Sequence, residues 1–522
     1  MVLLRSIITV GGFTMMSRIL GFVRDILVAA FLGAGAIADA FFVAFKMPNF
    51  FRRLFAEGAF NAAFVPLFAA KLTDEGLAPA ASFAAAVLSV MVTFLLVFVT
   101  ALQIAMPWLM YVFAPGFADD PEKFGLAVDL TRITFPYLLF ISLVSLLGGV
   151  LNSLGRFAAA AATPIILNIV LIGALLLATP YLPSAGHSLA WGVAVAGVVQ
   201  FLWLMTACRR EGVLLRLRRP RLSKPVRRLL KLMVPGAIGA GVVQINLLID
   251  IVIASILPTG AISLLYYADR INQLPLGVVG VAVGTALLPL LSKQIRAGED
   301  HEALNSMNRA IEIALLFTIP GAAALLIIGH PIVSVLFERG AFDSTTSIAT
   351  AQALMAYAIG LPAYVLIKVL APGFFARQDT ATPVKIAILC VLINVVLNLT
   401  LIQFLAHVGI ALATAISAWI NALLLVTLLQ KRGQFQTDSR LRQRTVRIIL
   451  AAAGMAAALW FAFSGLQTFY ADGPAAQILV LAILVFGGMA FYFALVVLFR
   501  AASLEDVKSL LRRKENDKPS AA

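Results

Sequence analysis

The chain is dominated by apolar runs of about 20 residues that follow one another along its whole length. A helix of this length crosses a bilayer and satisfies its own backbone hydrogen bonds there. The runs predict an all-α polytopic membrane protein with Pro48 and Pro275 kinking its second and eighth spans. The fourteen predicted transmembrane helices are 6–32, 36–68, 80–111, 126–152, 160–181, 187–208, 226–256, 263–292, 304–329, 347–374, 383–405, 409–430, 445–466 and 474–499.

The positive charges lie mostly in short loops on one side of these runs. The net charge is +15, although only 12% of the residues are charged. Blocks 209–228 and 431–444 are rich in Lys and Arg, whereas the loops on the other side hold only Lys123 and Arg339 as clear cations. This pattern predicts that both termini are cytoplasmic. It explains the basic charge without a nucleic-acid partner.

The chain also contains an internal repeat. Residues 25–38 match 250–263, with Asp, Ile, Ala, Leu, Gly, Ala and Ile coinciding without a gap. Six spans return the chain to the same side, so the repeat is parallel and predicts two related six-helix lobes with a site between them. The predicted parts are an N-lobe at 1–210, a basic cytoplasmic linker at 211–225, a C-lobe at 226–432, two extra helices at 433–500 and a polar cytoplasmic tail at 501–522.

Charged residues inside three of the predicted spans need an explanation. A charge at the bilayer centre costs about 2.5–3.5 kcal/mol on insertion scales, so it usually faces a partner or a water-filled cavity. The charges are Arg18, Arg24 and Asp25 in the first span, Asp39, Lys46, Arg52, Arg53 and Glu57 in the second, and Asp269 and Arg270 in the eighth.

We expect these charges to line a polar cavity between the lobes. On an ideal helix Arg18 and Asp25 share one face. The second-span residues that share a face are Asp39, Lys46, Arg53 and Glu57. Six cations against four anions leave a positive surplus, and arginine suits bidentate phosphate binding. The alternatives are ion pairs that only hold helices together and, for Arg52, Arg53 and Glu57, a place at the cytoplasmic interface.

A second polar group is predicted in the C-lobe and consists of Asp250, Asn394, Asn398 and Thr414. Hard oxygen ligands suit a small cation such as Na⁺, and Asp250 alone could bind a proton. Interhelical hydrogen bonding is the alternative. No His or Cys spacing indicates a metal site, and Cys208 and Cys390 are expected to be small apolar filler.

Four segments closely resemble the MurJ family, also called MviN, and the resemblance runs over essentially the whole chain. They are SRILGFVRD (17–25), DAFFVAFKMPNFFRRLFAEGAFNAAFVP (39–66), YYADRINQLPLGVVGVAVGTALLPLLS (266–292) and KVLAPGFFARQDTATPVK (368–385). Members of this family are lipid II flippases of the bacterial cytoplasmic membrane. They belong to the superfamily of multidrug, oligosaccharidyl-lipid and polysaccharide exporters.

The resemblance implies two lobes around a central cationic cavity, with a lipid groove at the last two helices. The family's cavity residues match Arg18, Arg24, Arg52, Arg270, Asp39, Lys46 and Asp269 here. Gln273 stands where some relatives have an acid. The weaker candidates for the cavity or its gate are Asp25, Pro48, Asn49, Glu57 and Pro275.

The implied substrate is lipid II, an undecaprenyl-diphosphate-linked disaccharide-pentapeptide. Membrane lipids and other cell-wall synthesis proteins are further expected partners. Arg18, Arg24 and Arg270 would bind the diphosphate, while Arg52 and Lys46 would assist entry. No GxxxxGK[ST] motif is present, so we expect no ATP hydrolysis. For a flippase we expect no enzymatic activity and no cofactor, with Na⁺ or H⁺ as a candidate coupling ion.

Two other functions stay open. One is a cation-coupled exporter of drugs or of another polyprenyl-diphosphate-linked sugar; the positive surplus argues against cationic drugs. The other is an intramembrane polyprenyl-diphosphate glycosyltransferase, which would need carboxylates positioned for metal or base catalysis.

Overall fold

The computed structural model describes residues 2–53 and 58–502, and its regular structure in these ranges is helical. Within them, nine helical segments are long and apolar enough to cross a membrane, which confirms a polytopic helical protein. The helices are α1 (Val2–Leu32), α2 (Ala36–Arg52), α3 (Ala59–Glu75), α4 (Leu77–Ile104), α5 (Met106–Phe113), α6 (Pro121–Thr134), α7 (Tyr137–Ser153), α8 (Phe157–Ala161), α9 (Thr163–Gly173), α10 (Ala185–Arg210), α11 (Lys224–Ser255), α12 (Ala261–Arg296), α13 (Asp300–Phe337), α14 (Ser344–Phe375), α15 (Ala381–Lys431), α16 (Ser439–Tyr470) and α17 (Pro474–Leu498).

The boundary predicted between 383–405 and 409–430 lies inside α15. The backbone leaves the helical region at Ala406, where φ is 46° and ψ is −128°. A Cβ at Gly409 would lie 2.7 Å from the backbone of Leu401, so the two halves of α15 approach closely at this break. A positive φ is unfavourable for alanine, and the surrounding packing therefore has to hold this turn.

Two prolines inside helices free a carbonyl that accepts a hydrogen bond from a hydroxyl group of a neighbouring helix. Pro48 has no N–H, so the carbonyl of Ala44 loses its helical partner, and Thr134 of α6 donates to it at 2.9 Å. Pro320 frees the carbonyl of Leu316 in the same way, and the Tyr492 hydroxyl of α17 donates to it at 2.7 Å. Water is scarce inside a membrane, so these side chains replace the missing backbone donors.

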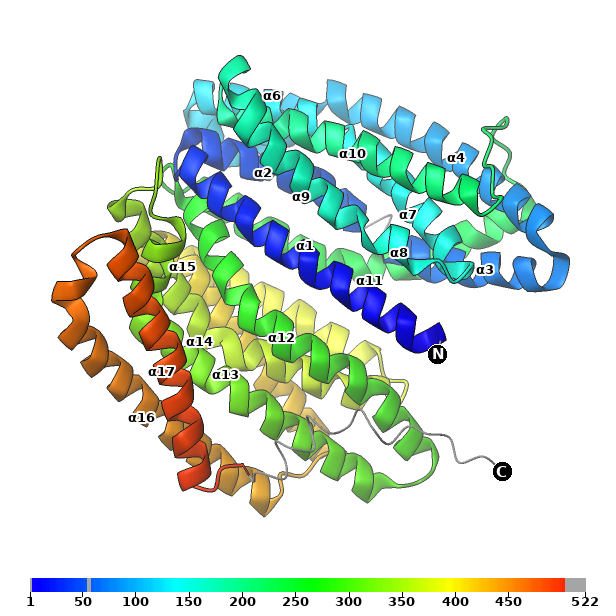
Figure 1. Cartoon of the computed structure of the whole chain (residues 1–522). Coiled ribbons are helices and arrows are strands. Elements are labelled where there is room, and N and C mark those ends of the chain that lie inside the picture. The colour runs from blue at the N-terminus through cyan, green and yellow to red at the C-terminus, as the bar shows by residue number, and fades with distance from the viewer. Residues whose placement is uncertain (1, 54–57, 503–522) are drawn as a thin grey trace. The chain divides into compact units, whose positions relative to one another are not determined.

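The chain forms two compact units, Met1–Ser263 with Arg339–Asp343, and Leu264–Glu338 with Ser344–Ala522. In the first unit α1 runs beside α9 (Figure 1). Helix α11, which the sequence assigns to the C-lobe, packs against α3 in this unit. Ser255 near its end accepts a hydrogen bond from the N–H of Gly116 at 3.2 Å. The predicted lobe boundary at 211–225 stays a prediction. The boundary between the two compact units of the structure falls after Ser263.

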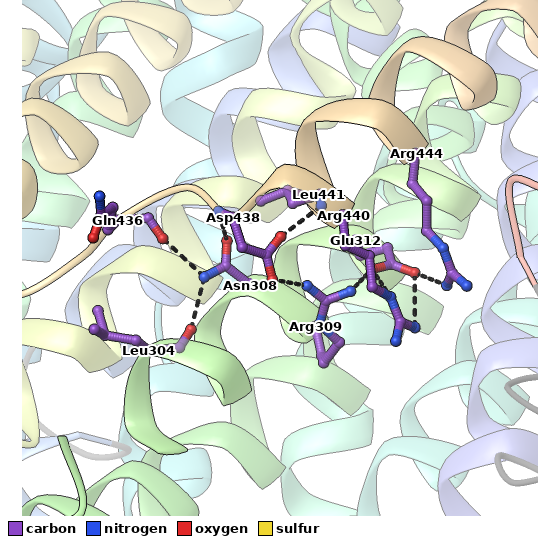
Figure 2. Close-up of polar contacts among 9 residues, drawn as sticks. All are labelled: Leu304, Asn308, Arg309, Glu312, Gln436, Asp438, Arg440, Leu441 and Arg444. Atoms are coloured by element: carbon purple, nitrogen blue, oxygen red, sulfur yellow. Dashed lines mark hydrogen bonds and ion pairs between the residues drawn. The ribbon is translucent and has the colours of Figure 1, made fainter. Parts of the chain in front are cut away.

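In the second unit α16 and α17 pack against α13 (Figure 1). Their apolar contact includes Leu316, Met455, Leu459 and Tyr492. A network of charges joins α13 to the start of α16 (Figure 2). We call this the Glu312 network, and its members are Arg309, Glu312, Asp438, Arg440 and Arg444.

Glu312 is the centre of the Glu312 network. Its side chain is 9% exposed and forms ion pairs with Arg309 of its own helix and with Arg440 and Arg444 of α16. Arg309 also pairs with Asp438, which caps α16 by accepting the N–H of Leu441. The network therefore fastens the first turn of α16 to α13.

Candidate functional site

The arginine of α1 that the sequence places at mid-span is held by two neighbours. The Nε and Nη2 of Arg24 donate to the same oxygen of Asp25 at 3.1 and 2.7 Å, and its Nη1 donates to Oδ1 of Asn168 at 2.9 Å. Arg24 is 9% exposed and Asp25 is 4% exposed. The structure thus places a buried, oriented guanidinium beside α9.

Arg18 lies in a different environment from Asp25, although seven residues of helix bring both to one face. Arg18 is exposed on α1 and forms no ion pair with the described residues. Asp25 is buried and paired with Arg24. Sharing a helix face is therefore not enough to pair Arg18 with Asp25.

Asp39 of α2 lies in a closed group of donors. Its carboxylate accepts from Lys123 Nζ at 2.9 Å, from the N–H groups of Gly260 and Ser263 at 2.7 and 3.0 Å, and from the Ser263 hydroxyl at 2.6 Å. Lys123 also donates to Thr259 at 3.2 Å. We call Asp39, Lys123, Thr259, Gly260 and Ser263 the Asp39 network.

The Asp39 network corrects one reading of the sequence. Lys123 was expected to be a loop cation, but its side chain is 4% exposed and that of Asp39 is 1% exposed. The network closes the N-terminus of α12 with a carboxylate, which is favourable because the first N–H groups of a helix have no acceptor within the helix. Asp39 is thus compensated locally, and its direct contact with substrate stays a prediction.

The remaining α2 candidates differ from one another in burial. Lys46 and Arg52 are half-buried and Arg53 is exposed, while Glu57 lies outside the described residues. The four-residue face proposed for Asp39, Lys46, Arg53 and Glu57 is therefore described only in part, and its members range from buried to exposed. Pro48 is buried, and Asn49 donates to the carbonyl of Phe45 at 2.7 Å.

Arg52 lines a cavity inside the first unit. The cavity has a volume of about 210 Å³ and lies among α3, α7, α9 and α10, with Asn61, Thr163 and Gln200 in its wall. Gln200 donates to the carbonyl of Thr163 at 2.7 Å, and the oxygens of Asn61 and Gln200 are buried without a donor among the described residues. The lining is mixed, and its polar groups suit water or other hydrogen-bonding groups.

The α12 candidates belong to the second unit. Arg270 stacks on the ring of Tyr266, with 4.8 Å from its guanidinium carbon to the ring centre, and Gln273 donates to Asp269. Pro275 lies inside α12, which continues past it. The approach of Arg270 to the α1 cations across a shared cavity stays a prediction.

The proposed cation ligands are divided between the two units. Asp250 lies in α11 of the first unit, whereas Asn394, Asn398 and Thr414 lie in α15 of the second. The amide of Asn398 donates to Asn394 at 3.0 Å, and Thr414 donates to the carbonyl of Ile410 in its own helix. Both hydrogen bonds lie within α15, between residues one turn apart, so neither of them joins α15 to another helix. A joint cation site with Asp250 stays a prediction.

Sequence reasoning missed Lys123 as a partner of Asp39 and Asn168 as a partner of Arg24. Each pair joins residues far apart in the chain, 84 and 144 positions respectively. Asn168 had one local signal, because it is a polar residue inside the apolar run of α9. Cys208 and Cys390 are both buried, as expected of apolar filler.

Comparisons with known proteins cover almost the whole chain. The family model described as lipid II flippase MurJ matches residues 28–481. A probable lipid II flippase MurJ of Rhizobium meliloti (strain 1021) is 47% identical over 519 residues, covering 98% of this chain and 97% of that protein. A lipid II flippase MurJ of Burkholderia cenocepacia is 38% identical over 462 residues, covering 87% and 89%.

Solved structures agree with this match. A lipid II flippase MurJ in an inward closed conformation superposes with a TM-score of 0.79 at 28% identity, covering 94% of this chain and 99% of that one. An inward-facing multidrug resistance transporter of the MATE family gives a TM-score of 0.66 at 15% identity, covering 81% and 97%. At that identity the second likeness concerns the fold alone.

Proposed function

The chain belongs to the MurJ family of lipid II flippases, and on that premise we propose that it moves lipid II across the bacterial cytoplasmic membrane by alternating access. The diphosphate and sugar-peptide headgroup would enter from the cytoplasmic leaflet while the polyprenyl tail stays in lipid. We propose fourteen spans with both termini cytoplasmic, a tail groove at α16 and α17, and no enzymatic activity.

The observation that carries this proposal is the buried guanidinium of Arg24 in α1. Arginine presents five N–H donors, and three of those on Arg24 are engaged by Asp25 and Asn168. We propose that the other two N–H groups donate to an oxyanion of the substrate. Planar double donors suit phosphate, and low polarity around them strengthens the contact.

We propose that contacts at the predicted extracytoplasmic ends gate the cycle. Besides the Asp39 network, the N–H of Ala341 donates to the carbonyl of Ala30 at 2.8 Å. A Cβ at Gly33 would lie 2.2 Å from the Ala341 carbonyl oxygen, so this approach needs glycine there. These contacts would have to part before the headgroup leaves on the extracytoplasmic side.

Energy for transport would come from the membrane. A potential of 100 mV supplies about 2.3 kcal/mol per charge, and an inside-negative potential drives an anionic headgroup outward. A Na⁺ or H⁺ gradient is the second proposed source, with Asp250, Asn394, Asn398 and Thr414 as ligands.

The test is translocation of labelled lipid II in vesicles that contain the purified chain, with an imposed potential and with Na⁺ or H⁺ gradients. Arg18→Ala and Arg270→Ala are each expected to abolish translocation and support of growth while the protein still inserts. Normal complementation by both variants at native expression contradicts the cavity assignment. Chemical change of lipid II without movement would favour the glycosyltransferase instead.

A further inference from the structure

Asn168 of α9 accepts a hydrogen bond from the guanidinium of Arg24. We propose that Asn168 is a positioning residue: it holds the Arg24 guanidinium in the pose that receives the substrate diphosphate, and Gly21 leaves the space that this requires. The inference rests on the proposed function, because it concerns the same binding group.

The Asn168 side chain bridges two points of α1. Its Oδ1 accepts from Arg24 Nη1 at 2.9 Å, and its Nδ2 donates to the carbonyl of Ser17 at 3.0 Å. Ser17 lies about two turns before Arg24, so the amide contacts two successive turns of α1 and joins this helix to α9. Asn168 is 4% exposed, and both ends of its amide are used.

The two bonds fix which way the amide points. A backbone carbonyl only accepts, so the Nδ2 must face Ser17 and the Oδ1 must face Arg24. Asp25 holds the Nε and Nη2 side of the guanidinium, while Asn168 holds Nη1. With both sides held, the plane of the guanidinium is set before substrate arrives, and less rotamer entropy is lost on binding.

A neutral partner at 168 has an electrostatic reason. Arg24 and Asp25 together carry no net charge. An amide orients Arg24 and leaves that balance unchanged, whereas a second carboxylate would make the group negative and repel a diphosphate. A carboxylate would also lose the donor to Ser17. Asn168→Asp therefore keeps the acceptor for Arg24 and changes only the charge and the donor.

Gly21 faces the Asn168 amide. A Cβ at Gly21 would lie 3.4 Å from Nδ2 and 3.8 Å from Oδ1, which is ordinary contact for one methyl group. A larger side chain would extend into the amide. Gly21→Ala is therefore expected to be tolerated, and Gly21→Leu is expected to displace Asn168 without changing a polar group.

The experiment measures lipid II translocation by the full chain in vesicles as a function of lipid II concentration. Asn168→Ala is expected to raise the half-saturating concentration about tenfold, which corresponds to about 1.4 kcal/mol, with a smaller effect on the maximal rate. Asn168→Asp is expected to raise the half-saturating concentration more than Asn168→Ala does. Gly21→Leu is expected to raise it about as much as Asn168→Ala. In an Arg24→Ala background, Asn168→Ala is expected to add nothing, because the residue acts through Arg24.

Asn308→Ala is the matched control. Asn308 is also buried, with its Nδ2 donating to the carbonyls of Leu304 and Gln436 at 2.9 Å each, but it lies in α13 of the second unit. Its loss should lower thermal stability and leave the half-saturating concentration unchanged.

Several results overturn the inference. They are an unchanged half-saturation in Asn168→Ala, an equal rise in Asn308→Ala, and an undiminished effect of Asn168→Ala when Arg24 is already absent. If Asn168→Ala does not fold, Gly21→Leu against Gly21→Ala decides the same question. Normal translocation by Arg24→Ala would instead remove Arg24 from the proposed function, which is a distinct failure.

Discussion

The Asp39 network and the Glu312 network solve the burial of an acid in different ways. Asp39 is matched by one lysine and completed by neutral donors, and both charged side chains are at most 4% exposed. Glu312 is 9% exposed but has three arginines around it, and the side chain of Arg440 is 45% exposed.

The difference follows from access to water. A fully buried pair has to be neutral, because an uncompensated charge is costly in a low-dielectric interior. The Glu312 network can hold more cations than anions, because water solvates the excess at its exposed side. We therefore expect that replacing either charged residue of the Asp39 network destabilises the protein strongly. In the Glu312 network, replacing an exposed arginine should have a small effect.

The largest expected effect is at Asp39. Asp39→Ala leaves the Lys123 ammonium buried without its carboxylate and should lower the free energy of unfolding by about 3–5 kcal/mol. Thermal and denaturant unfolding in detergent measure it. Lys71→Met is the control, since the exposed Lys71–Glu75 pair, at 2.7 Å, should contribute under about 1 kcal/mol. A similar decrease in the free energy of unfolding in both variants would show that burial does not make the Asp39–Lys123 pair more important than the Lys71–Glu75 pair.

A smaller effect is expected at Glu312. Glu312→Gln should destabilise the attachment of α16 by about 2–3 kcal/mol, because three arginines lose their shared anion while water still reaches part of the cluster. Hydrogen exchange at residues 439–447 should accelerate. Arg440 lies at the exposed side of the network, so Arg440→Gln should change hydrogen exchange at residues 439–447 only slightly. An acceleration as large as that of Glu312→Gln would contradict this expectation.

An uncharged contact gives a third comparison. Tyr492→Phe leaves the Leu316 carbonyl without a donor and should cost about 1–3 kcal/mol, because Pro320 supplies no N–H to it. In a Pro320→Ala background the backbone donor returns, so the same substitution should cost less. Unfolding of the parent protein, the two single variants and the double variant gives the coupling energy, and additive losses would refute the role assigned to Pro320.

The smallest effect concerns a half-buried acid between α14 and α15. Hydrogen bonds from Thr382, helped by Arg432, lower the pKa of Asp379 from 3.8 to about 2. A depressed pKa stabilises the folded state above the unfolded value and this contribution is lost as pH falls, here between about pH 4 and pH 2. Asp379→Asn should remove that part of the pH dependence and cost under about 1 kcal/mol at pH 7. An unaltered acid profile would show that Asp379 contributes nothing.

Much of this protein follows from the sequence alone. Runs of about 20 apolar residues predict helices, since a backbone in lipid has to satisfy its own hydrogen bonds. The break between 383–405 and 409–430 was predicted and lies at Ala406. Arg24 and Asp25 stood out because charges are rare inside such runs, and the structure finds them buried and paired.

The partners of those charges were decided only by the tertiary structure. Periodicity places a residue on a helix face, but it does not say which distant helix packs there. Lys123 looked like a loop cation until the fold brought it to Asp39, and Asn168 had no assigned role until α9 packed on α1. Local sequence fixes helix phase and length, whereas pairing depends on contacts between segments more than eighty residues apart.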